Sequence, residues 1–287
     1  MLIFQAIVLG LVQGLAEFIP VSSSAHLVIL PWLFGWADPV LKGLTFDVSL
    51  HIGTLVALIV FFASDWWRLI KAWFRSVAER RIGGDPDRRM AWFLLVACVP
   101  GGLAGVLLEK KIEELFHPGG AITGAAMHWM AAIIALLGAF LLLADSLGKK
   151  SRDMGTMGWK DALAIGFAQA LAIFPGVSRS GATITAGLAV GLERPAAARF
   201  SFLLSAPIIA GAGAKSLLEL MKGAASGAIP QDELILFPIG FLVAAVSGWL
   251  CIKFLLSFLQ RHSTKVFVWY RWALAALVAI VALSRGL

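Results

Sequence analysis

Long apolar runs, and not short alternating or amphipathic patterns, dominate this sequence. Uninterrupted runs of roughly 17–25 apolar residues are long enough to cross a bilayer as helices. Such runs lie at about residues 48–64, 90–108, 121–144, 200–218, 234–258 and 266–283. The pattern predicts an all-α integral membrane protein with six transmembrane helices.

Two further apolar segments are each interrupted midway, one at Pro20 and one at Pro175, and a cluster of small and polar residues follows each proline. Proline disfavours helix in the residue before it, and Ser22 or Ser23 could cap a new helix that runs to about Leu33. Irregular backbone at membrane depth is tolerated only where protein surrounds it or where it lines a wet cavity. We therefore expect two re-entrant helix-loop-helix pairs that meet at a cavity.

The two interrupted segments are copies of each other. Residues 10–24 align with residues 166–180 without gaps and share eight identities in 15 positions. The identical residues in the first copy are Gly10, Gln13, Leu15, Ala16, Phe18, Val21, Ser22 and Ser24. This internal duplication predicts a first repeat over residues 1–150 and a second over residues 151–287, together forming one membrane domain. Because each repeat would cross the membrane three times, the second would be upside down, which is an inverted-topology repeat.

Basic residues predict which side of the membrane each connection faces. Of the 24 Lys and Arg, 15 lie in the connections 65–89, 145–160, 192–199 and 259–265. Loops rich in Lys and Arg stay in the cytoplasm, so we expect these four connections to be cytoplasmic. The Pro20 break then opens to the outside and the Pro175 break to the inside.

Composition excludes several classes of function. Apolar residues make up 60% and charged residues 14% of the 287, and the mean hydropathy is +0.87, so a separate soluble domain is not expected. The net charge of +7 is scattered over short loops, which predicts lipid attraction and no nucleic-acid partner. Neither a nucleotide-binding P-loop nor a zinc-binding spacing is present. Cys98 and Cys251 lie in apolar runs, where buried free thiols are expected.

The first break concentrates groups that can do chemistry. Gln13 and Glu17 share a helix face by their spacing of four, and Ser22, Ser23, Ser24 and His26 follow them. A charged side chain at mid-bilayer costs roughly 2.5–3.5 kcal/mol on insertion scales. We therefore expect Glu17 to face a cavity, a cation or a partner; the alternative is a polar residue that packs helices together.

The second break carries Arg179 at the position of Ser23. Arg179 lies among Ser178, Ser180 and Thr183 at the start of a helix, where free backbone amides favour an anion. This arrangement predicts a phosphate-binding site. The alternative is that Arg179 neutralises Glu17 in a structural ion pair.

Other polar residues carry weaker predictions. Asp47 and His51 share a helix face near the start of a span and are interpreted as supporting or structural residues. Single ionisable groups occur in apolar runs at His128, Lys215, Lys253 and Arg271, and the long cationic ones are expected to extend to the membrane interface.

The motifs of both breaks resemble those of the BacA/UppP-type undecaprenyl-diphosphate phosphatases. Gln13 to Glu17 is similar to the family's (E/Q)xxxE motif, and the run PGVSRSGAT at 175–183 to its PGxSRSxxT motif. The similarity extends over essentially the whole chain and includes EFIPVSSSAH at 17–26, FDV at 46–48 and FSFLLSAP at 200–207. The chain departs from the family by the Gln variant at position 13 and by Ala25 where Gly is frequent.

This resemblance implies removal of the terminal phosphate of undecaprenyl diphosphate, at the outer face of the bacterial plasma membrane. It implies catalytic roles for Glu17, Ser23, His26 and Arg179, and a divalent cation, Mg²⁺ or Ca²⁺, held by Glu17 and Gln13. The residues expected at the substrate phosphates are Ser22, Ser24, Ser178, Arg179, Ser180 and Thr183. The expected partners are this lipid and the membrane, and the sequence is compatible with a homo-oligomer.

The sequence leaves the mechanism and one rival function open. Ser23 could attack phosphorus, or Glu17 could activate water, with His26 as the proton carrier. A structural alternative makes Ser23 only a helix cap. A lipid-phosphate flippase or other secondary transporter would also combine inverted repeats with broken helices. A receptor or a purely structural membrane protein would not need two charged breaks.

Overall fold

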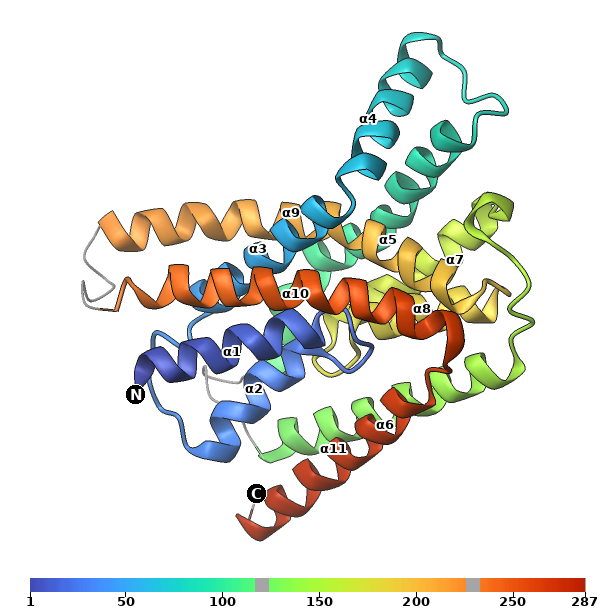
Figure 1. Ribbon diagram of the computed structural model, residues 1–287. Coiled ribbons are helices and arrows are strands. Elements are labelled where there is room, and N and C mark those ends of the chain that lie inside the picture. Colours follow the sequence, from blue (N-terminus) through green and yellow to red (C-terminus); the bar gives the residue numbers. More distant parts are fainter. Residues whose placement is uncertain (117–123, 226–232, 287) are drawn as a thin grey trace.

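The computed structural model describes residues 1–116, 124–225 and 233–286, and these residues are helical and contain no β-strand (Figure 1). The α-helices are α1 (Leu2–Ala16), α2 (Ser23–Phe34), α3 (Leu44–Phe61), α4 (Ala63–Ala78), α5 (Pro86–Phe116), α6 (Gly124–Leu147), α7 (Trp159–Ala170), α8 (Arg179–Ala189), α9 (Arg194–Ala225), α10 (Leu236–Arg261) and α11 (Lys265–Ser284). Two short 3-10 helices, η2 (Met154–Thr156) and η3 (Leu171–Ile173), precede and follow α7.

The long helices confirm a multi-pass membrane protein. Within the described ranges, four helices are long and apolar enough to cross a bilayer, namely α5 over Pro86–Leu108, α6, α10 and α11. A fifth crossing is added if α3 and α4, which meet at a bend of 80°, count as one span. The end of the predicted span 200–218, with Lys215, falls outside the residues whose side chains the structure describes.

Residues 65–89 were expected to form a loop, and this prediction was wrong for the first half of the segment. Residues up to Ala78 form the helix α4, and α5 begins at Pro86. The reason is the spacing of Trp67, Ile70 and Phe74, which places these apolar side chains on one face of a helix although basic residues interrupt them in the sequence.

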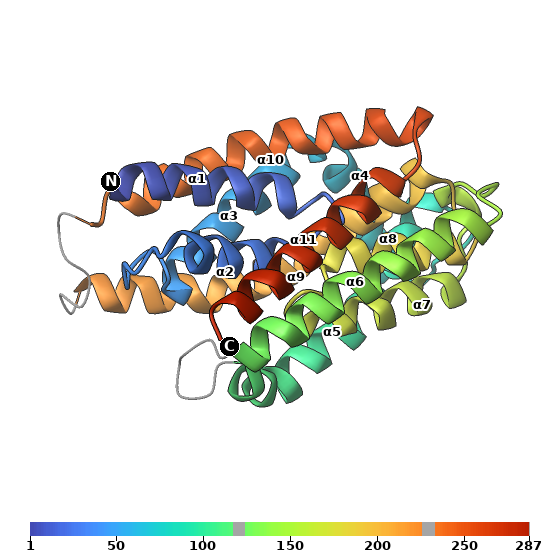
Figure 2. The ribbon, with the colours of Figure 1, turned by 90° about the horizontal axis from the view of Figure 1, so that it is seen from below.

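Small residues allow the helices around the first break to approach closely. α1 packs along α10, and α11 along α6, as two views of the molecule show (Figures 1 and 2). A Cβ atom added to Gly14 would lie 1.9 Å from Ser247 Oγ and 2.7 Å from the carbonyl oxygen of Ala244. Gly10 and Gly14 therefore form the small-residue stripe on which α10 packs.

Both predicted breaks are present, and each segment turns back on itself. α1 packs against α2, and α7 packs against α8, so the chain reverses direction at each break (Figure 2). At 15 residues, α1 is shorter than the roughly 20 residues that a straight crossing requires. The same holds for α7, which has 12 residues.

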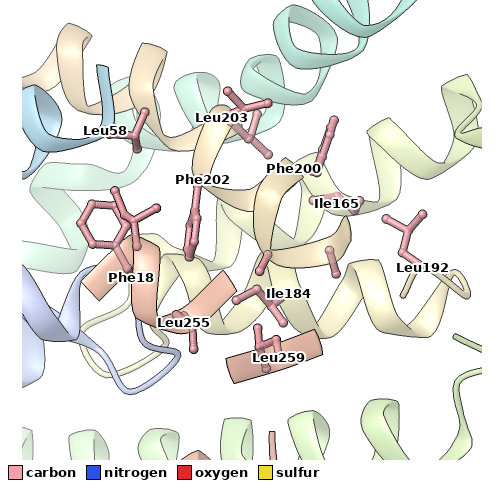
Figure 3. Close-up of a cluster of buried hydrophobic side chains, with 14 of the residues drawn as sticks. Phe18, Leu58, Ile165, Ile184, Leu192, Phe200, Phe202, Leu203, Leu255 and Leu259 are labelled. Carbon is pink, nitrogen blue, oxygen red and sulfur yellow. The ribbon is translucent and has the colours of Figure 1, made fainter. Parts of the chain in front are cut away.

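A large apolar core supports the first break from the side of α9. Figure 3 shows side chains from the first break and from α3, α7, α8, α9 and α10 meeting in this core. Phe18, which lies within the first break, packs edge-on against Phe202 of α9 with ring centroids 5.3 Å apart. Phe18 is 1% exposed, and its burial fixes the backbone directly after Glu17.

Candidate active site

The two breaks share an unusual local geometry. Ser22 has φ 77° and ψ 93°, and its hydroxyl accepts a hydrogen bond from the Ala25 amide at 3.4 Å. Ser178 has φ 70° and ψ 113°, and its hydroxyl accepts from the Gly181 amide at 3.1 Å. Left-handed backbone is uncommon for serine and costs of order 1–3 kcal/mol, and such strain clusters at functional sites. Each serine thus caps a helix that starts with the next residue, Ser23 in α2 and Arg179 in α8.

Glu17 is the point at which the first break concentrates its polar contacts. Its side chain is buried, and Oε2 accepts hydrogen bonds from Gln13 Nε2 at 2.9 Å and from Ser23 Oγ at 2.7 Å. His51 Nε2 lies 3.7 Å from the same oxygen. A buried carboxylate needs hydrogen-bond donors, and Gln13 and Ser23 supply two of them.

Arg179 meets Glu17 from the second break. One of its terminal guanidinium nitrogens forms an ion pair with Glu17 Oε1, and the other donates to the Ser205 carbonyl at 3.2 Å. The two side chains are only 14% and 5% exposed. Arg179 Nε is buried and has no hydrogen-bond partner among the described residues. The guanidinium therefore keeps a donor that an incoming anion can use.

The remaining hydroxyls of the second break bond to the protein. Ser180 Oγ donates to the Ile19 carbonyl at 3.2 Å and so connects the second break to the first. Thr183 Oγ1 lies 2.6 Å from Ser201 Oγ. Ser24 is exposed, with its hydroxyl 3.3 Å from Ser22 Oγ. Of the predicted phosphate-binding groups, Arg179 thus pairs with Glu17, whose other oxygen accepts from Ser23. Ser22, Ser178, Ser180 and Thr183 form hydrogen bonds within the protein.

The structure does not make Ser23 the cap of α2. Ser22, and not Ser23, is the residue that caps α2. The Ser23 hydroxyl instead points to the Glu17 carboxylate and is partly exposed. Ser23 is therefore a hydroxyl with a carboxylate acceptor at hydrogen-bond distance, which is the geometry that a serine nucleophile and its base require.

His26 does not contact Glu17 or Ser23 through any hydrogen bond in the described part of the chain. Its Nδ1 lies 2.6 Å from the Ser22 carbonyl oxygen and must donate to it, and its Nε2 lies 2.7 Å from the Tyr270 hydroxyl. The two rings are stacked with centroids 5.7 Å apart. His26 thus supports the turn at Ser22, and Tyr270 is a residue that the sequence did not single out.

Arg271 was expected to extend to the membrane interface, and this was wrong. Its side chain is 1% exposed, and its Nε donates to the Ile134 carbonyl at 2.9 Å. The terminal nitrogens donate to the Pro20 carbonyl at 3.1 Å and to the Gly176 carbonyl at 3.0 Å. One guanidinium therefore fastens the two breaks to each other. An ionisable residue inside an apolar run was the available signal, because such residues are rarely placed without a function.

Polar contacts outside the core fix the start of the second broken segment. Arg152 donates to both carboxylate oxygens of Asp161, at 2.7 and 3.2 Å. Partial burial raises the pKa of the Asp161 carboxyl, but the hydrogen bonds from Arg152 and from the Gly158 amide outweigh it and hold that pKa below its usual range. The pair anchors α7 at its first turn.

The donor set near Glu17 fits a divalent cation that is shared with a substrate. The described residues contain no group of three or more His, Cys, Asp or Glu that could enclose a metal ion. Gln13 Oε1 is buried without a hydrogen-bond partner among these residues, and it belongs to the same side-chain amide whose Nε2 donates to Glu17. Mg²⁺ is commonly bound through one or two carboxylates together with water and phosphate oxygens, so these two oxygen donors match that mode and not a protein-only cage.

Comparison of the chain with known proteins identifies its family. The model of the bacitracin resistance protein BacA family matches residues 6–277. An undecaprenyl-diphosphatase of Thermomicrobium roseum is 47% identical over 284 residues, which cover 99% of each chain. Undecaprenyl-diphosphatases of Rubrobacter xylanophilus and Moorella thermoacetica are each 47% identical over 282 residues, or 98% of both chains. The family match and the near full-length similarity show that this chain belongs to the BacA family.

Proposed function

We propose that this chain is an undecaprenyl-diphosphate phosphatase, which hydrolyses undecaprenyl diphosphate to undecaprenyl phosphate and inorganic phosphate. The names of its full-length relatives support this activity. At the site itself, one observation supports the proposal. The Glu17–Arg179 ion pair joins two strained breaks, and Ser23 Oγ lies 2.7 Å from Glu17. The product is the lipid carrier that cell-wall synthesis uses again.

In the proposed binding step, the diphosphate enters between the breaks and takes the place of Glu17 at the guanidinium of Arg179. Arg179 can then offer two parallel N–H groups to phosphate oxygens, the geometry that arginine provides and lysine does not. The unpartnered Nε of Arg179 supports this exchange, because a donor for one more acceptor is already present. Release from Arg179 leaves Glu17 with Ser23 and Gln13 as its partners.

The proposed chemical step uses Ser23 as nucleophile and Glu17 as base. Ser23 Oγ attacks the terminal phosphorus while its proton passes to Glu17, and the anhydride bond to undecaprenyl phosphate breaks. Water then hydrolyses the phosphoserine and releases inorganic phosphate. The hydrogen bond from Ser23 to Glu17 supports this route over direct activation of water by Glu17. Arg179 stabilises the charge on the transferred phosphoryl group.

A divalent cation, Mg²⁺ or Ca²⁺, would be held by Glu17 and the side-chain carbonyl of Gln13 and would neutralise part of the phosphate charge. The amide of Gln13 already orients Glu17 through its hydrogen bond at 2.9 Å. His26 is assigned here to the support of the Ser22 turn, since both ring nitrogens are engaged.

The proposed arrangement is six crossings and two re-entrant pairs in an inverted repeat, in the bacterial plasma membrane. The concentration of Lys and Arg in four connections supports an inner location for these connections and an outward opening of the Glu17 break. The matching left-handed caps at Ser22 and Ser178 support the duplication.

The experiment that tests the function uses the purified chain in proteoliposomes with a divalent cation. Undecaprenyl diphosphate is supplied at the outer face, and inorganic phosphate and transbilayer lipid movement are measured together. We expect release of one phosphate per lipid. Lipid movement without phosphate release would instead establish a flippase and reject the proposal.

A further inference from the structure

α4 continues from α3 after a sharp bend. Only Phe62 separates it from α3, and the two helices meet at 80°. Figure 1 shows α4 turning away from α3, with the first part of α5 beside it. If α3 crosses the bilayer, a bend of 80° places α4 nearly in the membrane plane, at the side of the basic connections.

The residues of α4 divide into three faces. One face is buried against the protein and consists of Asp65, Leu69, Ala72 and Ser76. A second face is apolar and exposed, with exposed fractions of 63% for Trp67, 47% for Ile70, 61% for Phe74 and 47% for Val77. A third face carries the exposed cations Arg68, Lys71 and Arg75.

Contacts on the buried face hold α4 in this orientation. Asp65 accepts hydrogen bonds from Arg68 and from Arg199 of α9, both at 2.7 Å. Ser76 Oγ accepts from the indole nitrogen of Trp92 in α5 at 2.9 Å. The apolar face is therefore not a surface that a small rotation of α4 could bury.

An exposed apolar face with cations beside it is the pattern of a helix that lies in a lipid interface. Such helices place an apolar face at the boundary between headgroups and acyl chains, and cations beside it attract anionic lipid. Lys71 Nζ lies 4.4 Å above the Trp67 ring, so the ammonium is held at the edge of the apolar face. A direct link to a membrane helix keeps the whole of α4 close to the same leaflet.

We propose that α4 is an in-plane interfacial helix whose partner is a leaflet that contains anionic phospholipid. Trp67, Ile70, Phe74 and Val77 enter the acyl boundary. Lys71 and Arg75 contact lipid phosphates from the water side, whereas Arg68 is shared with Asp65. This surface is separate from the Glu17–Arg179 site and binds lipid that is not turned over.

The first test measures the depth of α4 in nanodiscs that contain the full-length chain. A fluorophore is attached to Phe74→Cys or, as a control on the polar side, to Ser64→Cys, with Cys98 and Cys251 replaced by Ala. We expect a nitroxide at carbon 5 of the acyl chain to quench the Phe74 label at least threefold more than the Ser64 label. Quenching of the Phe74 label by aqueous iodide, or its shielding from both quenchers by a second copy of the chain, would overturn the proposal.

The second test measures lipid selectivity with spin-labelled phosphatidylglycerol and phosphatidylcholine. The variant Lys71→Gln/Arg75→Gln removes two cations from α4, and the matched control Lys149→Gln/Lys265→Gln removes two exposed cations from the same side of the protein. We expect the preference for phosphatidylglycerol to fall at least twofold only in the α4 variant. An equal fall in both variants, or no preference in the unmodified chain, would contradict an anionic-lipid surface on α4.

Discussion

Glu17 and Arg179 lie 162 positions apart in the sequence and form a buried ion pair that joins the two breaks of the chain. Because removing one partner of such a pair leaves an unpaired buried charge, costing about 3–5 kcal/mol, the pair holds the two breaks together. A phosphate group that replaces the carboxylate at Arg179 preserves the charge balance of that residue. The same contact can thus serve folding without substrate and binding with it.

Arg179→Lys is expected to lower kcat/KM at least about tenfold, because an ammonium cannot supply two parallel hydrogen bonds to phosphate. Arg179→Ala should lose more, at least about a hundredfold. Phosphate release by the purified variants measures both effects.

The melting temperature of each Arg179 variant in detergent is the control for folding. Near-normal turnover of a folded Arg179→Lys would mean that only the charge matters. Near-normal turnover of a folded Arg179→Ala would remove Arg179 from the site.

Ser23→Ala is expected to lower kcat by about a thousandfold or more with little change in stability, because Ser22 and not Ser23 caps α2. Ser23→Thr should retain part of the activity, since it keeps a hydroxyl that can donate to Glu17. The matched control is Ser64→Ala, which removes an exposed hydroxyl of α4, outside the breaks, and should leave turnover within about twofold.

Rapid quenching with substrate labelled in the terminal phosphate tests the intermediate itself. The label should appear transiently on Ser23 in the unmodified chain. A folded Ser23→Ala that keeps substantial turnover, without any trapped label in the unmodified chain, would assign the activation of water to Glu17.

Arg271→Gln is expected to lower both stability and activity. The substitution leaves the Pro20 and Gly176 carbonyls, among others, without their buried donor, and each unsatisfied group costs about 1–3 kcal/mol. Arg285→Gln, at the C-cap of the same helix, is the matched control, because Arg285 also donates to backbone carbonyls, those of Trp32 and Leu33, but is exposed. Melting temperature and phosphate release should fall together for Arg271→Gln only; equal behaviour of the two variants would refute the role of Arg271 in joining the breaks.

Single cysteines should report the orientation of the chain in whole cells. A cysteine in place of Lys42 should react with an impermeant thiol reagent from outside, whereas cysteines in place of Arg80 or Lys149 should react only after permeabilisation. Labelling at position 80 in intact cells would reverse the predicted orientation and place the Glu17 break on the inside.

The sequence predicted those features that depend on local backbone chemistry. Pro20 and the serines after it predicted the end of one helix and the start of the next, and α1 does end at Ala16 and α2 does begin at Ser23. The spacing of Gln13 and Glu17 predicted their shared face, and their side chains are hydrogen-bonded.

The distant contacts of Arg271 and His26 could not be predicted. Arg271 donates to backbone carbonyls, which every residue type carries, so no partner residue marks its role in the sequence. The pairing of His26 with Tyr270 spans 244 positions and follows from the packing of α2 near α11. The basic residues of α4 predict a cytoplasmic connection, and they obscure the helical spacing of its apolar residues. That spacing explains why α4 is a helix and not a loop.

The most direct test of the central claim is the turnover of Glu17→Gln. This change keeps the size of the side chain but removes the charge that pairs with Arg179 and the base that accepts the Ser23 proton. We predict that the folded variant releases terminal phosphate from undecaprenyl diphosphate at least about a thousandfold more slowly than the unmodified chain. A folded Glu17→Gln with turnover within about twofold of the unmodified chain would contradict a catalytic site centred on Glu17 and Arg179.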